Sequence, residues 1–529
     1  MSQAQLFERM RQPSFYGSDV TGVEIMQTHI SFVALAGSYA YKVKKAVNFG
    51  FLDFSTLEKR KHFCEEELRL NRRLCPEIYL AVVPITMHNK ELKLDGQGEI
   101  VDYAVKMKRF PQEYMMMHRL AQNQVGENTI EKICTILVEF YQKDQPTKEI
   151  ISFGQVEAIK KNVVENFEQT TSVIDLTIPK KMYQFIERVS YEFFDTRKKV
   201  FEDRIKEGHI HDCHGDLHSG NIVINDGICI FDCIEFNKRF RYCDIASDIG
   251  FLAMDLDFQN KPFLSSFLME TYMNKSGDKG VHDVLNLYKS YRAYVRGKVL
   301  GFRLDDPHVH PQEKNEIVAT ASKYFELSHY YASLLDIDLH LPRPLCFMVS
   351  GITGTGKSTL AKKLSIDYHA QVLNSDMLRK QLAGIDAFEH HFDGVNKGLY
   401  APQKTQQTYE SLCNNALEIL HQKNHVIVDA TFQQKTFRDL LKNTAEEAHA
   451  IFIPIGCTCP DEKARQWLNQ RLRKKTVSDG RWEIFLSQKK SFETYTPEEQ
   501  VIVIDMADER YEGRMTAFRR ILARIKEEQ

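Results

Sequence analysis

The chain has 529 residues, more than one hydrophobic core usually organises, so two or three domains are expected. Its composition of 43% hydrophobic and 27% charged residues is ordinary for a globular protein, and the formal net charge of -2 gives no sign of a nucleic-acid or membrane partner. The polar start, MSQAQLFERMRQPSFYG, lacks the apolar core of a signal peptide, so we expect a cytoplasmic protein with reduced cysteines.

The first half of the chain begins with strands. The short β-prone runs VEIMQT, FVALAG and YAYKVKK, between residues 23 and 47, predict three strands. A helix is predicted over Thr56–Leu74, followed by strands in LAVVPITM and YAVKMKRF around a turn at Asp95–Gly98. Residues 128–207 are mostly helical in pattern, so a strand-rich lobe should precede a helical lobe.

A short segment, residues 213–236, interrupts the helical pattern and carries the chemistry. His214, Asp216 and Asn221 have the H-x-D-x-x-x-x-N spacing in which the aspartate accepts a hydroxyl proton and the asparagine binds Mg²⁺. A predicted hairpin, NIVINDGICIFD, then supplies Asp232 as a second metal ligand. Asp244 and Asp248, on the following helix, should brace the loop rather than react.

The string HGDLHSGN resembles the motif of aminoglycoside phosphotransferases, and the resemblance extends from Met1 to about Leu335. It implies a kinase-like fold in which Lys42 holds the ATP phosphates, with Lys44 on the same strand face as the reserve candidate. Glu67, or its neighbour Glu66, would pair with that lysine from the helix. Two features depart from the kinase pattern: the loop QTHIS has no glycine, and the D-F-G position reads Asp-Cys-Ile.

The histidines of HIHDCHGDLH suggest a second interpretation of the same segment. Four histidines, at positions 209, 211, 214 and 218, could in principle hold zinc. The kinase spacing already accounts for His214, and nothing else in the sequence indicates tetrahedral ligands. We therefore favour the kinase interpretation.

The segment LHLPRPL, at Leu339–Leu345, has two prolines before an apolar strand and marks a domain boundary. We place a kinase-like domain at 1–335, a linker at 336–344 and a second domain at 345–529. In the second domain the runs LCFMVS, QVLNS, HVIVDAT, AIFIPIGC and VIVID alternate with helical patterns. That alternation predicts a parallel α/β sheet.

The string GITGTGKST fits the P-loop pattern G-x-x-x-x-G-K-[ST] between an apolar strand and a helix. Its glycines let backbone N–H groups face a phosphate, Lys357 adds a cation, and Ser358 offers a hydroxyl to Mg²⁺. The predicted nucleotide-binding residues are Gly351, Gly354, Thr355, Gly356, Lys357, Ser358 and Thr359.

Further candidates follow the P-loop. Asp429 ends the strand HVIVDAT and either assists Mg²⁺ binding, contacts the acceptor or caps the strand. No second carboxylate follows it to activate water for a motor ATPase. Asp376 either accepts the proton of an attacking hydroxyl or caps its helix, with Arg379 one turn later to hold an anion. Arg471, near Arg465 and Arg473, either neutralises the transferring phosphoryl group or lies on a solvated basic face.

The strings GITGTGKST, NSDMLR, VIVDATF and the R-x-x-x-x-x-x-SD pattern from Arg471 resemble the small P-loop kinases related to polynucleotide kinase, gluconate kinase and zeta toxin. The resemblance implies that Asp376 is the general base and Arg471 the lid arginine. The fold class is then multidomain α/β: a protein-kinase-like bilobal α+β domain followed by a parallel-sheet P-loop NTPase domain.

The two halves together indicate an ATP-dependent phosphotransferase with ATP and Mg²⁺ at two sites. The expected acceptors are hydroxyl groups of small molecules. Two alternatives stay open: a polynucleotide-type 5′-hydroxyl kinase, which the near-neutral charge does not favour, and an ATP-sensing regulatory protein with little turnover. The sequence gives no indication of oligomeric state.

Overall fold

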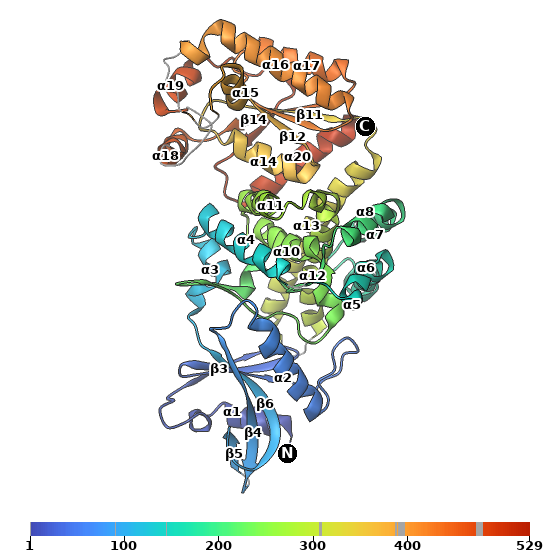
Figure 1. Cartoon of the computed structure of the whole chain (residues 1–529), viewed down its shortest axis with the longest axis vertical. Coiled ribbons are helices and arrows are strands. Elements are labelled where there is room, and N and C mark those ends of the chain that lie inside the picture. The colour runs from blue at the N-terminus through green and yellow to red at the C-terminus, as the bar shows by residue number, and fades with distance from the viewer. Residues whose placement is uncertain are drawn as a thin grey trace. The chain divides into compact units, whose positions relative to one another are not determined.

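The computed structural model describes residues 2–89, 91–143, 145–305, 309–386, 389, 397–471 and 480–528. These residues form two compact units, each with its own internal packing. Unit 1 comprises residues 1–171, 194–259 and 271–295, and unit 2 comprises residues 172–193, 260–270 and 296–529. Figure 1 follows the chain through both.

Unit 1 contains a six-stranded antiparallel sheet with the strand order β1-β2-β3-β6-β4-β5. The β-prone runs expected from the sequence all form strands, and one strand that the sequence did not predict, β5, precedes the turn at Asp95. The strands are β1 (Val23–Gln27), β2 (Ser31–Ala36), β3 (Tyr39–Lys44), β4 (Tyr79–His88), β5 (Glu91–Leu94) and β6 (Glu99–Lys108).

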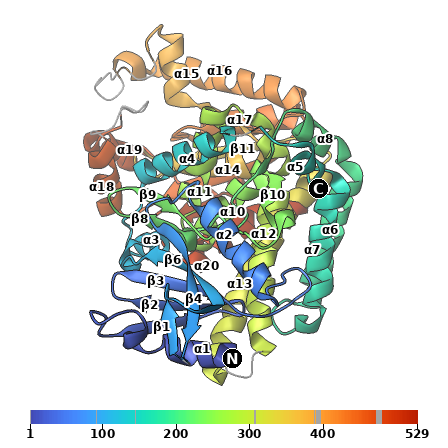
Figure 2. The ribbon, with the colours of Figure 1, turned by 60° about the horizontal axis from the view of Figure 1, so that its bottom comes forward.

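Helix α2 (Leu57–Asn71) follows β3 and packs against β4 and β6, as Figures 1 and 2 both show. Thr56 caps its first turn by accepting a hydrogen bond from the Lys59 N–H. The face that α2 turns toward the sheet buries the side chains of Cys64, Glu67 and Leu70. Because Glu67 is fully buried there, this helix positions a charge inside the unit.

The rest of unit 1 is mostly helical, as the pattern of residues 128–207 predicted. Two small antiparallel pairs interrupt the helices: β7 (Ile210–Asp212) with β10 (Tyr242–Asp244), and the predicted hairpin of β8 (Ile222–Ile224) with β9 (Ile228–Ile230). The helices are α1 (Gln3–Met10), α3 (Met116–Ala121), α4 (Glu127–Gln142), α5 (Lys148–Ser152), α6 (Val156–Thr170), α8 (Lys198–Lys206), α9 (Lys238–Arg241) and α10 (Ile245–Phe258). Three more, α7 (Lys180–Thr196), α11 (Pro262–Ser276) and α12 (His282–Phe302), have residues in both units.

Unit 2 contains a five-stranded parallel sheet with the order β12-β13-β11-β14-β15, which confirms the predicted sheet. The strands are β11 (Leu345–Ser350), β12 (Gln371–Asn374), β13 (Val426–Asp429), β14 (Ile451–Thr458) and β15 (Ile502–Asp505). Since the strands are parallel, the residues that follow β11, β12 and β13 meet at one edge of the sheet. That edge carries the P-loop, Asp376 and Asp429.

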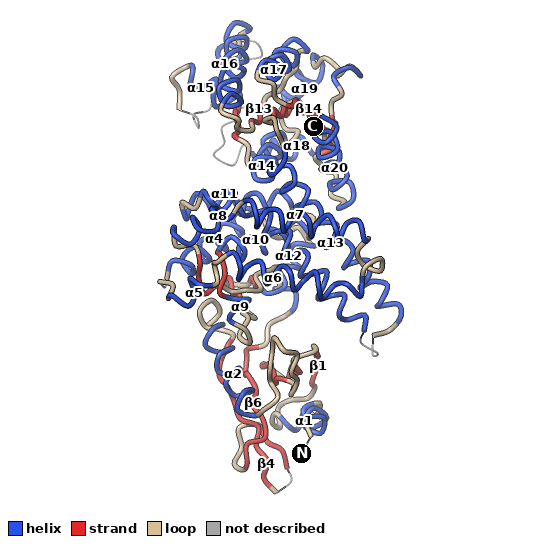
Figure 3. Tube along the Cα trace, turned by 90° about the vertical axis from the view of Figure 1, so that its right-hand side faces the viewer, coloured by secondary structure: helices blue, strands red, loops and turns tan. Residues whose placement is uncertain are grey.

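Helices cover both faces of this sheet, and the strands lie between them in Figure 3. On one face, Met348, Val426 and Val428 pack with Leu412 and Leu441 of the covering helices. The helices of unit 2 are α13 (Pro311–His340), α14 (Lys357–Tyr368), α15 (Ser375–Leu382), α16 (Pro402–His421), α17 (Lys435–Glu447), α18 (Asp461–Arg471), α19 (Trp482–Ser491) and α20 (Tyr511–Glu528). Doubly wound α/β sheets of this kind bind ligands at the carboxyl ends of their strands.

Helix α13 precedes the predicted boundary but packs with the P-loop part of the chain, against α14 and α20. The Tyr330 hydroxyl donates to Asp367 Oδ2 at 2.7 Å, and its ring lies 6.0 Å from that of Phe518. The contacts therefore group residues 296–340 with residues 345–529. The domain limits 1–335, 336–344 and 345–529 stay a prediction about the sequence.

The described part of the chain contains no helix long and apolar enough to cross a membrane. The expectation of reduced cysteines differs from the structure at one place, where Cys75 and Cys229 form a disulfide across a sequence separation of 154. Folding brings their Cα atoms to 4.8 Å, within disulfide reach, and sequence spacing alone does not reveal such a pairing. The other nine cysteines are free thiols, as expected.

Candidate phosphotransfer sites

In unit 1, side chains from β3, from α2 and from the segment after β9 form an ionic network. Lys42 and Lys44 leave β3 on the same face and both reach Glu67 of α2, with Nζ to carboxylate distances of 2.8 and 2.7 Å. Lys42 also lies 2.7 Å from Asp232 Oδ1, and Lys44 pairs with Glu235. The structure thus places both candidate lysines on Glu67.

Glu66, the other candidate partner, lies on the outer face of α2. Its carboxylate pairs with Arg69 one turn later, at 2.8 Å, and both side chains are partly exposed. Glu67, by contrast, has no exposed surface. The choice of Glu67 over Glu66 follows from which face of the helix meets the sheet.

The network sets the charges of its members. Burial alone would raise the pKa of Glu67, but the ammonium groups of Lys42 and Lys44 outweigh it and lower that pKa to about 2. Burial alone would lower the pKa of Lys42, yet the carboxylates of Asp232 and Glu67 raise it well above its ordinary value. Burial dominates at Glu235, whose pKa is raised. Lys42 is therefore held as a cation and Glu67 as an anion.

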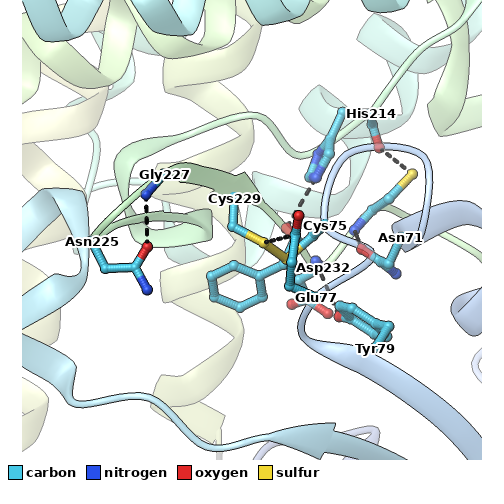
Figure 4. Close-up of a disulfide and its surroundings, with 11 residues drawn as sticks. Asn71, Cys75, Glu77, Tyr79, His214, Asn225, Gly227, Cys229 and Asp232 are labelled. Atoms are coloured by element: carbon cyan, nitrogen blue, oxygen red, sulfur yellow. Dashed lines mark hydrogen bonds between the residues drawn. A yellow bond between two sulfur atoms is a disulfide. The ribbon is translucent and has the colours of Figure 1, made fainter.

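Asp232 follows the β8–β9 hairpin in an unusual backbone conformation. Its φ of 62° lies in the left-handed region, which non-glycine residues rarely adopt. The Tyr79 hydroxyl accepts its N–H at 3.3 Å, and the Asn71 side chain accepts the N–H of Cys233 at 2.8 Å. Figure 4 shows these partners around Asp232, with the Cys75–Cys229 disulfide holding the hairpin close by. Strained residues of this kind concentrate at functional sites.

The loop that carries Asp216 is fixed mainly through Asp248. Asp248 accepts hydrogen bonds from the N–H groups of His214 and Gly215, at 3.0 and 2.8 Å. Gly215 has a φ of 85°, and a Cβ there would meet the Phe240 carbonyl oxygen at 2.8 Å, so only glycine fits. Asp248 thus braces the loop, whereas Asp244 caps α10 and pairs with Arg204.

Asn221 links the two acidic positions of unit 1. Its Nδ2 donates to the backbone oxygen and to Oδ2 of Asp216, both at 3.0 Å, and its backbone oxygen accepts the N–H of Phe231 next to Asp232. These bonds use the amide nitrogen, which leaves the amide oxygen as the group that would act as a ligand. An amide oxygen and the Asp232 carboxylate are the hard oxygen donors that Mg²⁺ prefers, so this donor set fits the metal.

The four histidines of the motif segment do not gather around one point. His214 Nε2 donates to the Phe231 carbonyl at 3.0 Å, His211 Nε2 lies 2.9 Å from the Gly208 carbonyl, and His209 lies near Glu207 and Asp278. Among the residues that the structure describes, no group of three or more histidine, cysteine or acidic side chains could hold a metal ion together. The zinc interpretation therefore finds no support in the geometry.

In unit 2 the P-loop lies between β11 and α14. Gly351, Gly354 and Gly356 have φ values of 135°, 80° and 87°. At Gly351 a Cβ would meet the Cys457 carbonyl oxygen at 2.5 Å. The Thr355 hydroxyl donates to the Ile352 carbonyl at 2.8 Å and tightens the loop. These conformations turn the backbone into the phosphate-binding form that the string predicted.

Lys357, Ser358 and Asp429 come together at the end of this loop. Burial lowers the pKa of Lys357, against the opposing effect of Asp429, and its Nζ donates to the Ile352 carbonyl at 3.0 Å. Burial raises the pKa of Asp429, while its hydrogen bonds with Ser358 and Asn374 oppose that shift. A hydroxyl beside a carboxylate is a donor set that suits Mg²⁺, so the arrangement fits the metal. Thr359, which follows Ser358 in α14, is exposed.

Asp376 is not the cap of its helix. That place is taken by Asn374, whose Oδ1 accepts the N–H groups of Asp376 and Met377 at 3.0 Å each. The Asp376 carboxylate instead accepts a hydrogen bond from Arg379 Nη1 at 3.0 Å. The Arg379 guanidinium also lies 4.6 Å from the centre of the Tyr400 ring and is 8% exposed. The pair is held beside the carboxyl end of β12.

Arg471, at the end of α18, approaches the same edge of the sheet. Burial lowers its pKa, and the carboxylates of Asp376 and Asp429 act against that shift, so both charges lie within electrostatic reach. Arg465 stacks over Trp482 at 5.6 Å instead. Arg473 and the Ser478–Asp479 pair of the expected lid lie outside the described residues.

The sequence analysis did not predict three residues that contact these sites. Glu235, which pairs with Lys44, follows Asp232 by three residues, and that spacing was the only signal. Asn374, which joins β12 to Asp429, could have been found as a polar residue ending a strand beside Asp376. Tyr400 offered no signal, because it meets Arg379 only through the fold.

Comparisons with known proteins find similarity both to one segment of the chain and to most of its length. Residues 346–495 match a protein-family model described as an AAA domain. An uncharacterized protein of Mycobacterium tuberculosis is 29% identical over 442 residues, which is 83% of this chain and 84% of that protein, and one of Mycobacterium bovis matches equally.

Two solved structures are similar to different parts of the chain. A gluconokinase from Sinorhizobium meliloti has 16% identity and a TM-score of 0.26, covering 35% of this chain and 94% of its own. A choline/ethanolamine kinase family protein from Mesorhizobium loti has 9% identity and a TM-score of 0.36, covering 63% and 99%. The chain thus combines a six-stranded antiparallel sheet in its N-terminal region with a five-stranded parallel sheet in the part whose residues 346–495 match the AAA-domain model.

Proposed function

We propose that the chain is an ATP-dependent phosphotransferase with two Mg–ATP sites, each of which phosphorylates a hydroxyl group of a small molecule. The observation that carries the proposal is that each unit holds a complete set of groups within itself. Unit 1 has Lys42, Asp216 and Asp232, and unit 2 has Lys357, Asp376 and Asp429. Phosphoryl transfer requires a cation that binds the phosphates, a carboxylate that accepts the hydroxyl proton and oxygen ligands for Mg²⁺.

In unit 1, Lys42 would bind the ATP phosphates, and Glu67 would keep the ammonium group in place. Asn221 and Asp232 would hold Mg²⁺, which neutralises charge on the phosphate oxygens when bound. Asp216 would accept the proton of the acceptor hydroxyl, because Asn221 and the backbone of the braced loop fix its carboxylate.

In unit 2, the P-loop amides and Lys357 would bind the phosphates, with Ser358 and Asp429 toward Mg²⁺. Asp376 would take the hydroxyl proton, and Arg379 would orient an acceptor or the transferring group. Arg471 would approach the developing charge from α18. Positioning and electrostatics, rather than covalent catalysis, would supply most of the rate in both units.

Two other functions have to be separated from this proposal. A polynucleotide-type kinase is favoured by the buried Arg379 beside Asp376, since a guanidinium suits a nucleic-acid phosphate. An ATP-sensing protein would need only the binding groups, and the intact Asp216 and Asp376 positions argue against it. Phosphate transfer to an acceptor separates all three.

The test uses the full chain in three forms: unchanged, with Lys42→Met, and with Lys357→Ala. Each is incubated with γ-labelled ATP, Mg²⁺ and separate panels of sugars, nucleosides, aminoglycosides, amino alcohols and 5′-hydroxyl oligonucleotides. Label on a small molecule that disappears with one variant assigns the acceptor to one unit. Label on oligonucleotides alone would support the polynucleotide alternative, and Mg–ATP binding without any transfer would favour the sensor.

A further inference from the structure

His218 lies two residues after Asp216, inside the same loop, and the proposed mechanism gives it no role. Its side chain is 12% exposed, and its ring packs against Phe251 with the centroids 5.6 Å apart. The residue also caps the short turn of residues 219–221, which ends at the metal-ligand candidate Asn221. Packing and capping together fix the plane of the imidazole.

The hydrogen bonds of the ring determine which nitrogen carries the proton. Nδ1 accepts the N–H of Gly220 at 3.0 Å, so it cannot itself hold a proton. The neutral ring therefore carries its proton on Nε2. That nitrogen lies 3.4 Å from Oδ2 of Asp216, so the Nε2–H group lies next to the carboxylate.

The same oxygen of Asp216 is approached from a second side. Asn221 Nδ2 donates to Oδ2 at 3.0 Å, so two nitrogens with N–H groups converge on one carboxylate oxygen. Two N–H groups near one oxygen restrict the rotation of the carboxylate about its Cβ–Cγ bond. Small errors in the direction of a general base are costly, because proton transfer depends on alignment.

We propose that His218 is a positioning residue that orients Asp216 through its Nε2–H while the Gly220 N–H holds the ring. The inference rests on the proposed phosphotransfer by unit 1 and deepens it by one residue. His218 does not take the acceptor proton: its Nε2 already carries one, and its Nδ1 is occupied by Gly220. Its effect is on the turnover rate, through Asp216, and not on the binding of ATP.

Two near-isosteric substitutions separate positioning from simple capping. In His218→Asn the amide oxygen keeps the place of Nδ1 and the bond with Gly220, but no N–H reaches Asp216. In His218→Gln the amide nitrogen occupies the place of Nε2 and can donate to Asp216, while the acceptor for Gly220 is lost. A capping role predicts that Gln is worse than Asn, and a positioning role predicts the reverse.

The kinetic test uses the full chain carrying Lys357→Ala, so that only unit 1 turns over, with the acceptor found in the panel. His218→Asn should lower kcat by about 10- to 100-fold, less than the roughly 100- to 10,000-fold that a general base itself contributes, with the KM for ATP within about twofold. His218→Gln should keep kcat within about threefold. Equal losses in both variants, or no loss in His218→Asn, would overturn the proposal.

A second measurement does not depend on turnover. Nitrogen NMR of the chain labelled with ¹⁵N-histidine, with His218→Gln used to assign the resonances, reports which ring nitrogen is protonated. We expect a protonated Nε2 and an unprotonated Nδ1, and a change at Nε2 in Asp216→Ala. A proton on Nδ1, or an Nε2 signal that does not change in Asp216→Ala, would refute the contact between His218 and Asp216. This measurement can be made even if the parent protein transfers no phosphate. Absence of transfer alone would count only against the proposed function.

Discussion

Replacing Glu67 by glutamine removes one charge from the buried network of unit 1 and keeps its shape. The change leaves Lys42 and Lys44 with only Asp232 and Glu235 as anionic partners. Of these three carboxylates, Glu67 is the one that contacts both lysines, and it is fully buried. The substitution therefore leaves Lys42 and the almost completely buried Lys44 with one anionic partner each in place of two.

The size of the effect follows from the pKa of Glu67. Against the effect of burial, the two lysines lower that pKa from its ordinary 4.5 to about 2. At about 1.4 kcal/mol per pKa unit, the ionised state is stabilised by about 3 kcal/mol. Because the folded pKa is the lower one, this stability is complete above about pH 5 and is lost as the pH falls toward 2.

The assay has to report on unit 1 specifically. The two tryptophans, Trp467 and Trp482, both lie in unit 2, so tryptophan fluorescence would miss the change. Hydrogen exchange of peptides from residues 57–71, read by mass spectrometry, follows the opening of α2 directly. A loss of about 3 kcal/mol should speed exchange there by about 100-fold. Peptides from residues 345–350 serve as the internal reference.

Glu66→Gln is the matched control, because it is the neighbouring residue and pairs only with the exposed Arg69. It should cost less than about 0.5 kcal/mol. Equal exchange in the two variants, or a gap between Glu67→Gln and the parent that stays constant from pH 7 to pH 3, would refute the assignment of this stability to the buried carboxylate.

The remaining predictions concern the nucleotide sites. Lys357→Ala should abolish ATP binding by unit 2 and leave that of unit 1, so calorimetry on the full chain should show one site fewer; an unchanged number would remove Lys357 from the site. Gly351→Ala should have the same effect, because its Cβ would meet the Cys457 carbonyl at 2.5 Å, whereas Gly22→Ala, which has open space around it, should bind as the parent does. Asp429→Asn should raise the Mg²⁺ concentration needed for half-maximal ATP binding by unit 2 about 10-fold or more, measured by titrating Mg²⁺ at fixed ATP. Equal concentrations in both proteins would contradict the placement of Asp429 beside the metal.

The elements of the fold were predictable where a local pattern determines them. Period-two alternation placed Lys42 and Lys44 on one face of a strand, and the structure brings both to Glu67. The alternation of apolar runs with helices predicted every strand of the parallel sheet. The P-loop was legible because its glycines have backbone conformations that other residues rarely adopt.

What the sequence did not reveal depends on contacts between distant segments. Tyr400 meets the Arg379 guanidinium only after the chain folds, and Cys75 meets Cys229 across 154 residues. The choice between Glu66 and Glu67 also needed the sheet, since both positions are polar and adjacent. Sequence motifs therefore predicted the candidate residues, whereas the contacts between distant residues became known only from the structure.

The packing of α13 bears on how this protein can be divided and how it could have been assembled from parts. Its buried Tyr330 supplies the hydroxyl that Asp367 accepts, and Asp367 in turn neutralises the buried Lys363 of α14. A fragment that starts at the strand β11 would lose that hydroxyl and open Lys363 to solvent. We therefore expect a fragment that begins before residue 311 to be more stable than one that begins at β11.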